Sequence, residues 1–135
     1  MREILFRGKR VGSEEWVEGF YLTSPEFDNQ EVAVITTDKP RNPYYVSKET
    51  IGQYTGLTDK NGTKIFEGDI VRVILPHFPT TIGVVEYHED FFGVDIKDVT
   101  PTQHCIGYAI KNGAVEIIGN IHDNPELLKE RDNDE

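Results

Sequence analysis

The chain is short of the residues that form disulfides and membrane spans. It has a single cysteine, Cys105, among 135 residues, so no internal disulfide can form, and a lone thiol suits a reducing compartment. No apolar run approaches the roughly 20 residues that a membrane helix needs. Charges at Arg2 and Glu3 beside a short apolar run argue against a secretory signal peptide. We therefore expect a cytoplasmic protein with no membrane partner.

Positive charge is also scarce, because 24 acidic residues outnumber 14 basic ones and the formal net charge is −10. Such a surface repels nucleic-acid phosphates unless its basic residues gather in one place. A small gathering occurs at the N-terminus, with Arg2, Arg7, Lys9 and Arg10. These residues are candidate phosphate contacts, although the solvated face of a hairpin explains them more simply. Nucleic-acid binding is therefore disfavoured, and mimicry of DNA by the acidic surface remains an alternative.

Turn residues between β-prone runs predict a mainly β fold, α+β at most. Asn61-Gly62 is a hairpin signal, since both residues tolerate positive φ. Gly68-Asp69 before the apolar run 70–73 is typical of the corner that leads into a central strand of a small SH3-like barrel. Asn124 and Pro125 suit the start of a short C-terminal helix. The expected domains are an N-terminal β subdomain (1–48), an SH3-like barrel with that helical turn (49–128) and a disordered acidic tail (129–135).

Strands are predicted wherever β-prone runs lie between turn signals. The predicted strands cover residues 2–8, 15–22, 31–36, 44–46 (a short edge strand), 70–75, 82–88, 91–97, 105–110 and 115–121. Within the stretch 50–73, a further strand and a short strand are predicted on either side of the Asn61-Gly62 turn. The last two are expected to form a hairpin around residues 111–113, with positive φ at its turn.

Histidines and one thiol are the candidates for metal binding or nucleophilic catalysis. His77, His88, His104 and His122 give only close sequence pairs, and adjacent residues of a strand point to opposite faces, so no zinc site is predicted. Cys105 could act as a nucleophile beside a histidine, but a buried cysteine in a β core is the favoured interpretation.

Acidic residues flank Gly68, where Glu67 and Asp69 could be taken for a catalytic pair. Aspartate in a turn usually accepts hydrogen bonds from backbone amides, so a structural role for Asp69 is favoured. Without a converging set of reactive groups, we expect no catalytic residue, no cofactor and no enzymatic activity.

Three blocks of sequence at the front, middle and back of the chain carry a family resemblance. They are residues 1–9 (MREILFRGK), 50–73 (TIGQYTGLTDKNGTKIFEGDIVRV) and 117–128 (IIGNIHDNPELL). Together they resemble the YopX family of phage and prophage proteins. The resemblance implies a small, mostly β, soluble protein of a bacterial host cell. It implies no activity and no catalytic residue.

The sequence therefore favours a non-enzymatic interaction module that binds a host or phage protein. Tyr44, Tyr45, His77 and Phe78 are the candidate contacts, because neighbouring prolines hold them away from a sheet interior. A nucleic-acid accessory protein that uses the basic N-terminal edge is the alternative, besides a DNA mimic. Open edges in the N-terminal sheet also favour a homo-oligomer.

Overall fold

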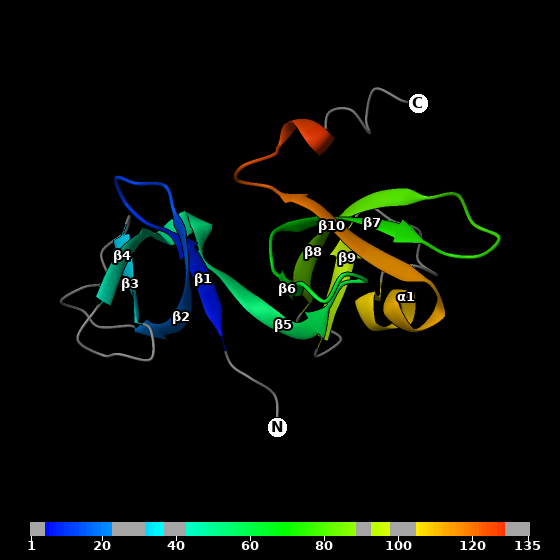
Figure 1. Ribbon diagram of the computed structural model, residues 1–135, viewed down its shortest axis with the longest axis horizontal. Helices are drawn as coiled ribbons and strands as arrows, with labels where there is room; N and C mark the ends of the chain where they lie inside the picture. Colours follow the sequence, from blue (N-terminus) through cyan, green and yellow to red (C-terminus); the bar gives the residue numbers. More distant parts are fainter. Residues whose placement is uncertain (1–4, 23–31, 37–42, 89–92, 98–104, 129–135) are drawn as a thin grey trace. The chain divides into compact units, whose positions relative to one another are not determined.

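The computed structural model describes residues 5–22, 32–36, 43–88, 93–97 and 105–128, and strands dominate these segments (Figure 1). The elements in chain order are β1 (Phe6–Lys9), β2 (Trp16–Leu22), β3 (Val32–Thr36), β4 (Pro43–Ser47), the 3-10 turn η1 (Lys48–Thr50), β5 (Gly52–Thr58), β6 (Lys64–Phe66), β7 (Asp69–Ile74), β8 (Thr81–His88), β9 (Gly93–Lys97), α1 (Ile106–Asn112) and β10 (Ala114–Asn120). The prediction of a mainly β protein is confirmed.

The chain divides into two compact units, Met1–Gly56 and Leu57–Glu135. In the first unit the strand order is β4-β3-β2-β1-β5, and β5 continues into the second unit, where β6 follows it. The second unit has a separate sheet with the order β10-β7-β8-β9. The described strands form antiparallel sheets, and no closed barrel is found among them. The sequence placed the domain boundary after residue 48, and the predicted tail at 129–135 lies outside the described residues.

The core of the first unit lies on one face of its sheet. Ala33, Ile35 and Val46 are fully buried there. The end of β1 also approaches β4, because Arg10 forms a bridge with Val46 and the Val11 N–H donates to the Tyr45 carbonyl oxygen at 3.0 Å. The sequence predicted an edge strand at residues 44–46, and β4 is indeed the terminal strand of this sheet.

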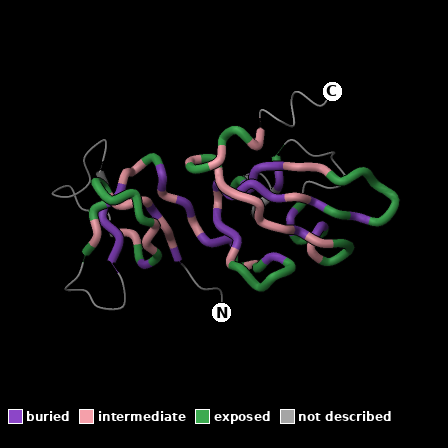
Figure 2. Tube along the Cα trace, turned by 45° about the horizontal axis from the view of Figure 1, so that its top comes forward, coloured by how far each residue is buried: buried purple, intermediate pink, exposed green. Residues whose placement is uncertain are grey.

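The second unit has its own core, which strands and one helix build together (Figure 2). Val71, Val73 and Val115 come from the neighbouring strands β7 and β10, and α1 adds Ile106 and Ala109. Since these side chains come from distant parts of the sequence, their burial joins the sheet and the helix into one packed body. No helix among the described residues has the length and apolarity to cross a membrane.

The β5–β6 hairpin lies where the sequence predicted it. Gly62 has φ +83°, which L side chains rarely adopt, and its N–H donates to the Asp59 carbonyl oxygen at 2.9 Å. The Asp59 N–H in turn donates to the Thr63 carbonyl oxygen at 2.9 Å. A turn followed by a left-handed glycine is a common three-residue hairpin connection, so Asn61 does not need the positive φ that was expected of it.

The strand predicted at 105–110 is wrong, because residues Ile106–Asn112 form the helix α1 (Figure 1). Ile106 and Ala109 are three positions apart and face the core, with Ile110 packed beside them, which is helical spacing. The expected positive φ at Gly113 is also wrong, since its φ is −158°. Glycine is required there for space: a Cβ would lie 2.1 Å from the Ile74 carbonyl oxygen.

The short C-terminal helix is confirmed in its described part, where residues 126–128 are helical. The Leu127 N–H donates to the Asn124 carbonyl oxygen at 3.1 Å. The Asn124 side chain accepts from the Asn120 N–H at 3.2 Å, so its amide oxygen fastens this turn to the end of β10.

Candidate functional site

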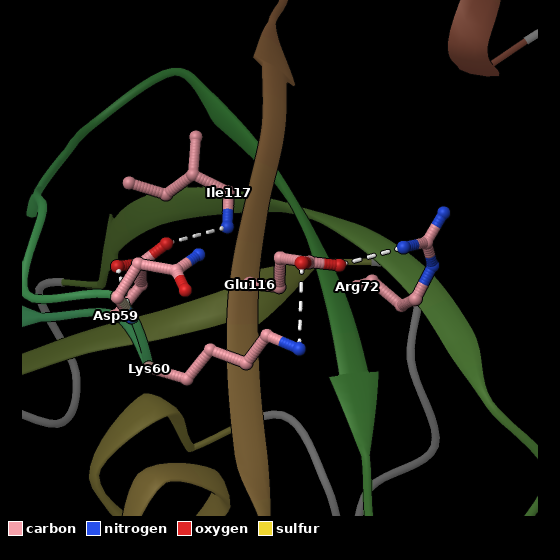
Figure 3. A network of polar contacts seen from close by, with 6 residues as sticks. Asp59, Lys60, Arg72, Glu116 and Ile117 are labelled. Carbon is pink, nitrogen blue, oxygen red and sulfur yellow. Dashed lines mark hydrogen bonds and ion pairs between the residues drawn. The ribbon is translucent and has the colours of Figure 1, made fainter.

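Asp59 is a buried residue at the β5–β6 turn, and its carboxylate accepts hydrogen bonds from three backbone N–H groups. Its Oδ1 accepts from the Asn61 N–H at 2.9 Å and the Thr63 N–H at 3.0 Å. Its Oδ2 accepts from the Ile117 N–H at 3.0 Å, on the outer edge of β10 (Figure 3). The Lys60 N–H donates to the Val115 carbonyl oxygen at 2.9 Å on that same edge. The turn is therefore fastened to β10 by two neighbouring residues.

The environment of Asp59 changes its acidity in two opposing ways. Burial favours the neutral acid and raises the pKa, but hydrogen bonds from the N–H groups of Ile117, Thr63 and Asn61, with the charge of Lys60, lower it by more. The pKa of Asp59 therefore lies below its ordinary value of 3.8. The site holds an anion, so the carboxylate has a structural role rather than that of a general acid.

This lowered pKa predicts an acid-sensitive fold. The unfolded chain takes up a proton at Asp59 near pH 3.8, whereas the folded chain does so only at lower pH. The contribution of Asp59 to stability is thus complete above the unfolded pKa and is lost as the pH falls through the folded pKa. Urea unfolding at a series of pH values should show this loss, and Asp59→Asn should remove that part of the pH dependence. An unchanged acid slope in the variant would contradict the assignment.

Glu116 holds two cations on the same side of the second sheet (Figure 3). Its Oε1 accepts from Arg72 Nη1 at 2.6 Å, and its Oε2 lies 3.4 Å from Lys60 Nζ. Arg72 and Glu116 are direct cross-strand partners on β7 and β10. These side chains are partly exposed, so the network is worth little to stability and mainly fixes the register of the turn against β10.

Asp69 has the structural role that the sequence favoured. Its side chain is 1% exposed, and Oδ2 accepts from the Phe66 N–H at 2.8 Å. Gly68 has φ +90° at this corner. A carboxylate that is buried against a backbone amide stabilises the corner, and the absence of a catalytic pair at Glu67 and Asp69 stays a prediction.

The predicted basic edge forms contacts with aromatic rings in the first unit. The Arg7 guanidinium lies 4.7 Å from the centre of the Trp16 ring, and Lys9 Nζ lies 5.8 Å from it. The Arg10 guanidinium lies 4.9 Å from the Tyr44 ring, and its Nη1 is 3.5 Å from a Glu15 carboxylate oxygen. The structure thus brings one basic candidate, Arg10, together with Tyr44, and Arg2 lies outside the described residues.

The four predicted aromatic and histidine contacts fall in both units. Tyr45 is 49% exposed on β4, whereas Tyr44 is half-buried and packs against the core. Phe20, which is 51% exposed on β2, was not among the contacts predicted from the sequence. The alternation of β2 offered a signal, since Val17, Gly19 and Tyr21 face inward and leave Phe20 outside.

In the second unit, His77 and Phe78 lie in the exposed connection between β7 and β8 (Figure 2). His77 has φ +68°, and the Phe78 N–H reaches the Leu75 carbonyl oxygen at 3.4 Å. These two candidates therefore lie together on one turn.

No group of three or more His, Cys, Asp or Glu residues that could hold a metal ion occurs in the described segments. His104 lies outside them, so the absence of a metal stays a prediction. Cys105 is exposed and immediately precedes α1, so the expectation of a buried core cysteine is wrong. The reason is the helix itself, which turns Ile106 rather than Cys105 into the core.

Comparison with known proteins agrees with the three sequence blocks. A family model described as YopX protein matches residues 5–129. The chain belongs to the YopX family. Among solved structures, protein EF1440 from Enterococcus faecalis is similar, with a TM-score of 0.61 and 24% sequence identity over 95% of this chain and 99% of that one. At that identity the likeness shows the fold alone. No curated protein matches this YopX-family chain.

Proposed function

We propose that this YopX-family chain is a non-enzymatic module that binds a protein of the host cell or of a phage. The supporting observation is an exposed tip on the second unit, which consists of Ile74 at the end of β7 and of His77 and Phe78 in the turn that follows. Phe78 is 45% exposed and Ile74 is 37% exposed. Exposed apolar groups of this size are typical of contact sites when they gather. Self-association through the open edges of the N-terminal sheet also stays a prediction.

The tip is held in shape before any partner binds. Pro76 and Pro79 fix φ on both sides, and His77 adopts a left-handed conformation between them. The hydrogen bond from Phe78 to Leu75 closes the turn. A side chain displayed on a rigid turn loses little entropy on binding, which favours affinity.

Charge defines the class of partner. Residues 57–135, the second unit, contain fifteen acidic and seven basic residues. An acidic surface speeds encounters with a basic one and disfavours acidic proteins. The proposed partner is therefore a protein with a basic surface around an apolar pocket.

Phe78→Ala is expected to weaken capture of this partner by at least about tenfold, the size of effect expected for an aromatic anchor. The full-length wild-type and variant chains would be immobilised at equal density and exposed to bacterial lysate at physiological salt. Proteins retained by the wild type and lost from the variant would be identified by mass spectrometry. Because Phe78 is exposed, its removal should change folding stability by no more than about 0.5 kcal/mol.

Tyr87→Ala is the matched control, since Tyr87 is 44% exposed in the same unit, on β8 rather than at the tip. The control should retain the partner. Equal retention by all three chains would overturn the proposal that the tip is the contact.

A DNA mimic would be a special case of this function. Its partner would be a nucleic-acid-binding protein, and duplex DNA would displace it from the immobilised chain. Displacement of the partner by DNA would support mimicry. Retention of the partner in excess DNA would instead indicate a partner that binds the tip.

We also infer that the second unit is an SH3-like barrel. The consecutive strands β7, β8 and β9 pair in order, and β10 returns beside β7. Asp59 and Lys60 add a contact between the β5–β6 turn and the outer edge of β10. This inference predicts slow hydrogen exchange at the Lys60 amide, and rapid exchange there would argue for an open sheet instead.

A further inference from the structure

The outer face of the first sheet brings basic and aromatic side chains together. Arg7 lies directly opposite Glu18, and Lys9 lies directly opposite Trp16, so these four residues share one face of β1 and β2. Phe20 follows on the same face, because it is two residues from Glu18. The opposite face is the core side, where Gly8 lies against Val46 and Ile35.

Exposed rings extend across this face as far as β4. Phe20 lies opposite Thr36 on β3, and Tyr45 lies opposite Val34 on the same strand. Phe20 and Tyr45 therefore lie on one face with β3 between them, and the usual strand spacing with an offset of two residues along the strand places them about 12 Å apart. Both rings are about half exposed, at 51% and 49%.

Positive charge is concentrated at the other end of the face. Arg7 and Lys9 lie over the Trp16 ring, whereas Arg10 is the bridge partner of the core residue Val46 and lies over Tyr44 on the core side of the sheet. In a chain of net charge −10, two cations over one ring are a local reversal of sign. A cation held over a ring keeps its charge and remains able to meet an anionic ligand.

We propose that this face binds single-stranded nucleic acid. Such a strand presents phosphates and flat bases in alternation, and the face offers cations beside exposed rings on a sheet. An acidic peptide would use the cations but would not supply an aromatic surface at each step for Phe20 and Tyr45. Duplex DNA keeps its bases stacked inside, so it would use only the charges.

One glutamate limits the strength of this binding. Glu18 lies directly opposite Arg7 on the same face. It reduces the net positive charge of the face, so the affinity should be modest and should fall steeply as salt rises. This proposal concerns the first unit and does not depend on the partner of the β7–β8 tip.

Trp16 is the one tryptophan in the sequence, so its fluorescence reports occupation of the face directly. Full-length protein would be titrated with an oligothymidylate of about 16 nucleotides at about 50 mM salt. We expect a saturable change in Trp16 fluorescence. Arg7→Gln combined with Lys9→Gln should weaken binding about tenfold and reduce the slope of log affinity against log salt by about 1.4.

The matched control removes the same charge from the second unit, where Lys97 and Lys111 are exposed. Lys97→Gln combined with Lys111→Gln should leave the salt slope unchanged. Phe20→Ala combined with Tyr45→Ala should weaken binding without changing that slope, because stacking releases no counterions. Should the first double variant lose its fold, Lys9→Gln alone should give half the change in slope.

Three results would overturn the proposal. The first is no change in Trp16 fluorescence at low salt. The second is an equal effect of the two charge-removal pairs, which would mean that the binding is unspecific. The third is an equal response to polyglutamate, which would assign the face to an acidic protein segment instead.

Discussion

Asp59→Ala is expected to lower the free energy of unfolding by about 3 kcal/mol, because the variant leaves three backbone N–H groups without their acceptor. The groups belong to Asn61, Thr63 and Ile117, and the lost carboxylate is only 7% exposed. Urea unfolding would measure the change. Hydrogen exchange at the Ile117 amide should also accelerate, since its acceptor would be gone.

Asp59→Asn provides a graded comparison. Its amide oxygen can still accept from Asn61 and Thr63, but its NH₂ group would then face the Ile117 N–H, so an intermediate loss is expected. Glu86→Gln is the control, since Glu86 is 46% exposed and only 3.8 Å from Lys97 in a surface ion pair. It should change stability by no more than about 0.5 kcal/mol. Equal stability of Asp59→Ala and the control would refute this role of Asp59.

Gly19→Ala should destabilise the first unit by about 3 kcal/mol or more. A Cβ at this position would lie 2.1 Å from the Thr36 carbonyl oxygen and 3.0 Å from Ile35 Cγ2. The first of these atoms is backbone, so relief requires β2 and β3 to separate where Phe20 pairs with Thr36. Thermal unfolding followed by circular dichroism would measure the loss.

Gly107→Ala is the matched control for that substitution. Gly107 lies in α1, and an added Cβ would meet no atom within 4 Å. Alanine favours helix over glycine, so this variant should gain about 0.5–1 kcal/mol. Opposite signs for the same chemical change would show that space at Gly19 is the cause, whereas a neutral Gly19→Ala would contradict the close approach of β2 and β3.

Local patterns predicted most of the strands and turns. Asn61-Gly62 located the β5–β6 hairpin, and Gly68-Asp69 located the corner before β7, because each of these signals acts over a few residues. The helix α1 was missed for a physical reason. Gly107 and Tyr108 do not by themselves favour a helix. The helix is stabilised by the burial of Ile106 and Ala109 in the core of the second unit.

The candidate contacts were predicted less completely than the strands. Arg7, Lys9 and Arg10 were found from their charge, but their meeting with Trp16 and Tyr44 depends on register between strands. Asp59 was missed because its partner Ile117 is 58 residues away in the sequence. The position of Asp59, two residues before Asn61, could have indicated its hydrogen bonds within the turn. Aspartate at the start of a turn often accepts hydrogen bonds from the backbone N–H groups that follow it.

Hydrogen bonding at the outer border of β10 also bears on how this protein behaves when concentrated. Strands with unoccupied backbone groups are templates for cross-β growth. Asp59 and Lys60 form hydrogen bonds with the Ile117 N–H and the Val115 carbonyl oxygen, so a strand of another chain cannot pair with these two groups. The same turn that orders the native sheet should therefore also delay fibril formation.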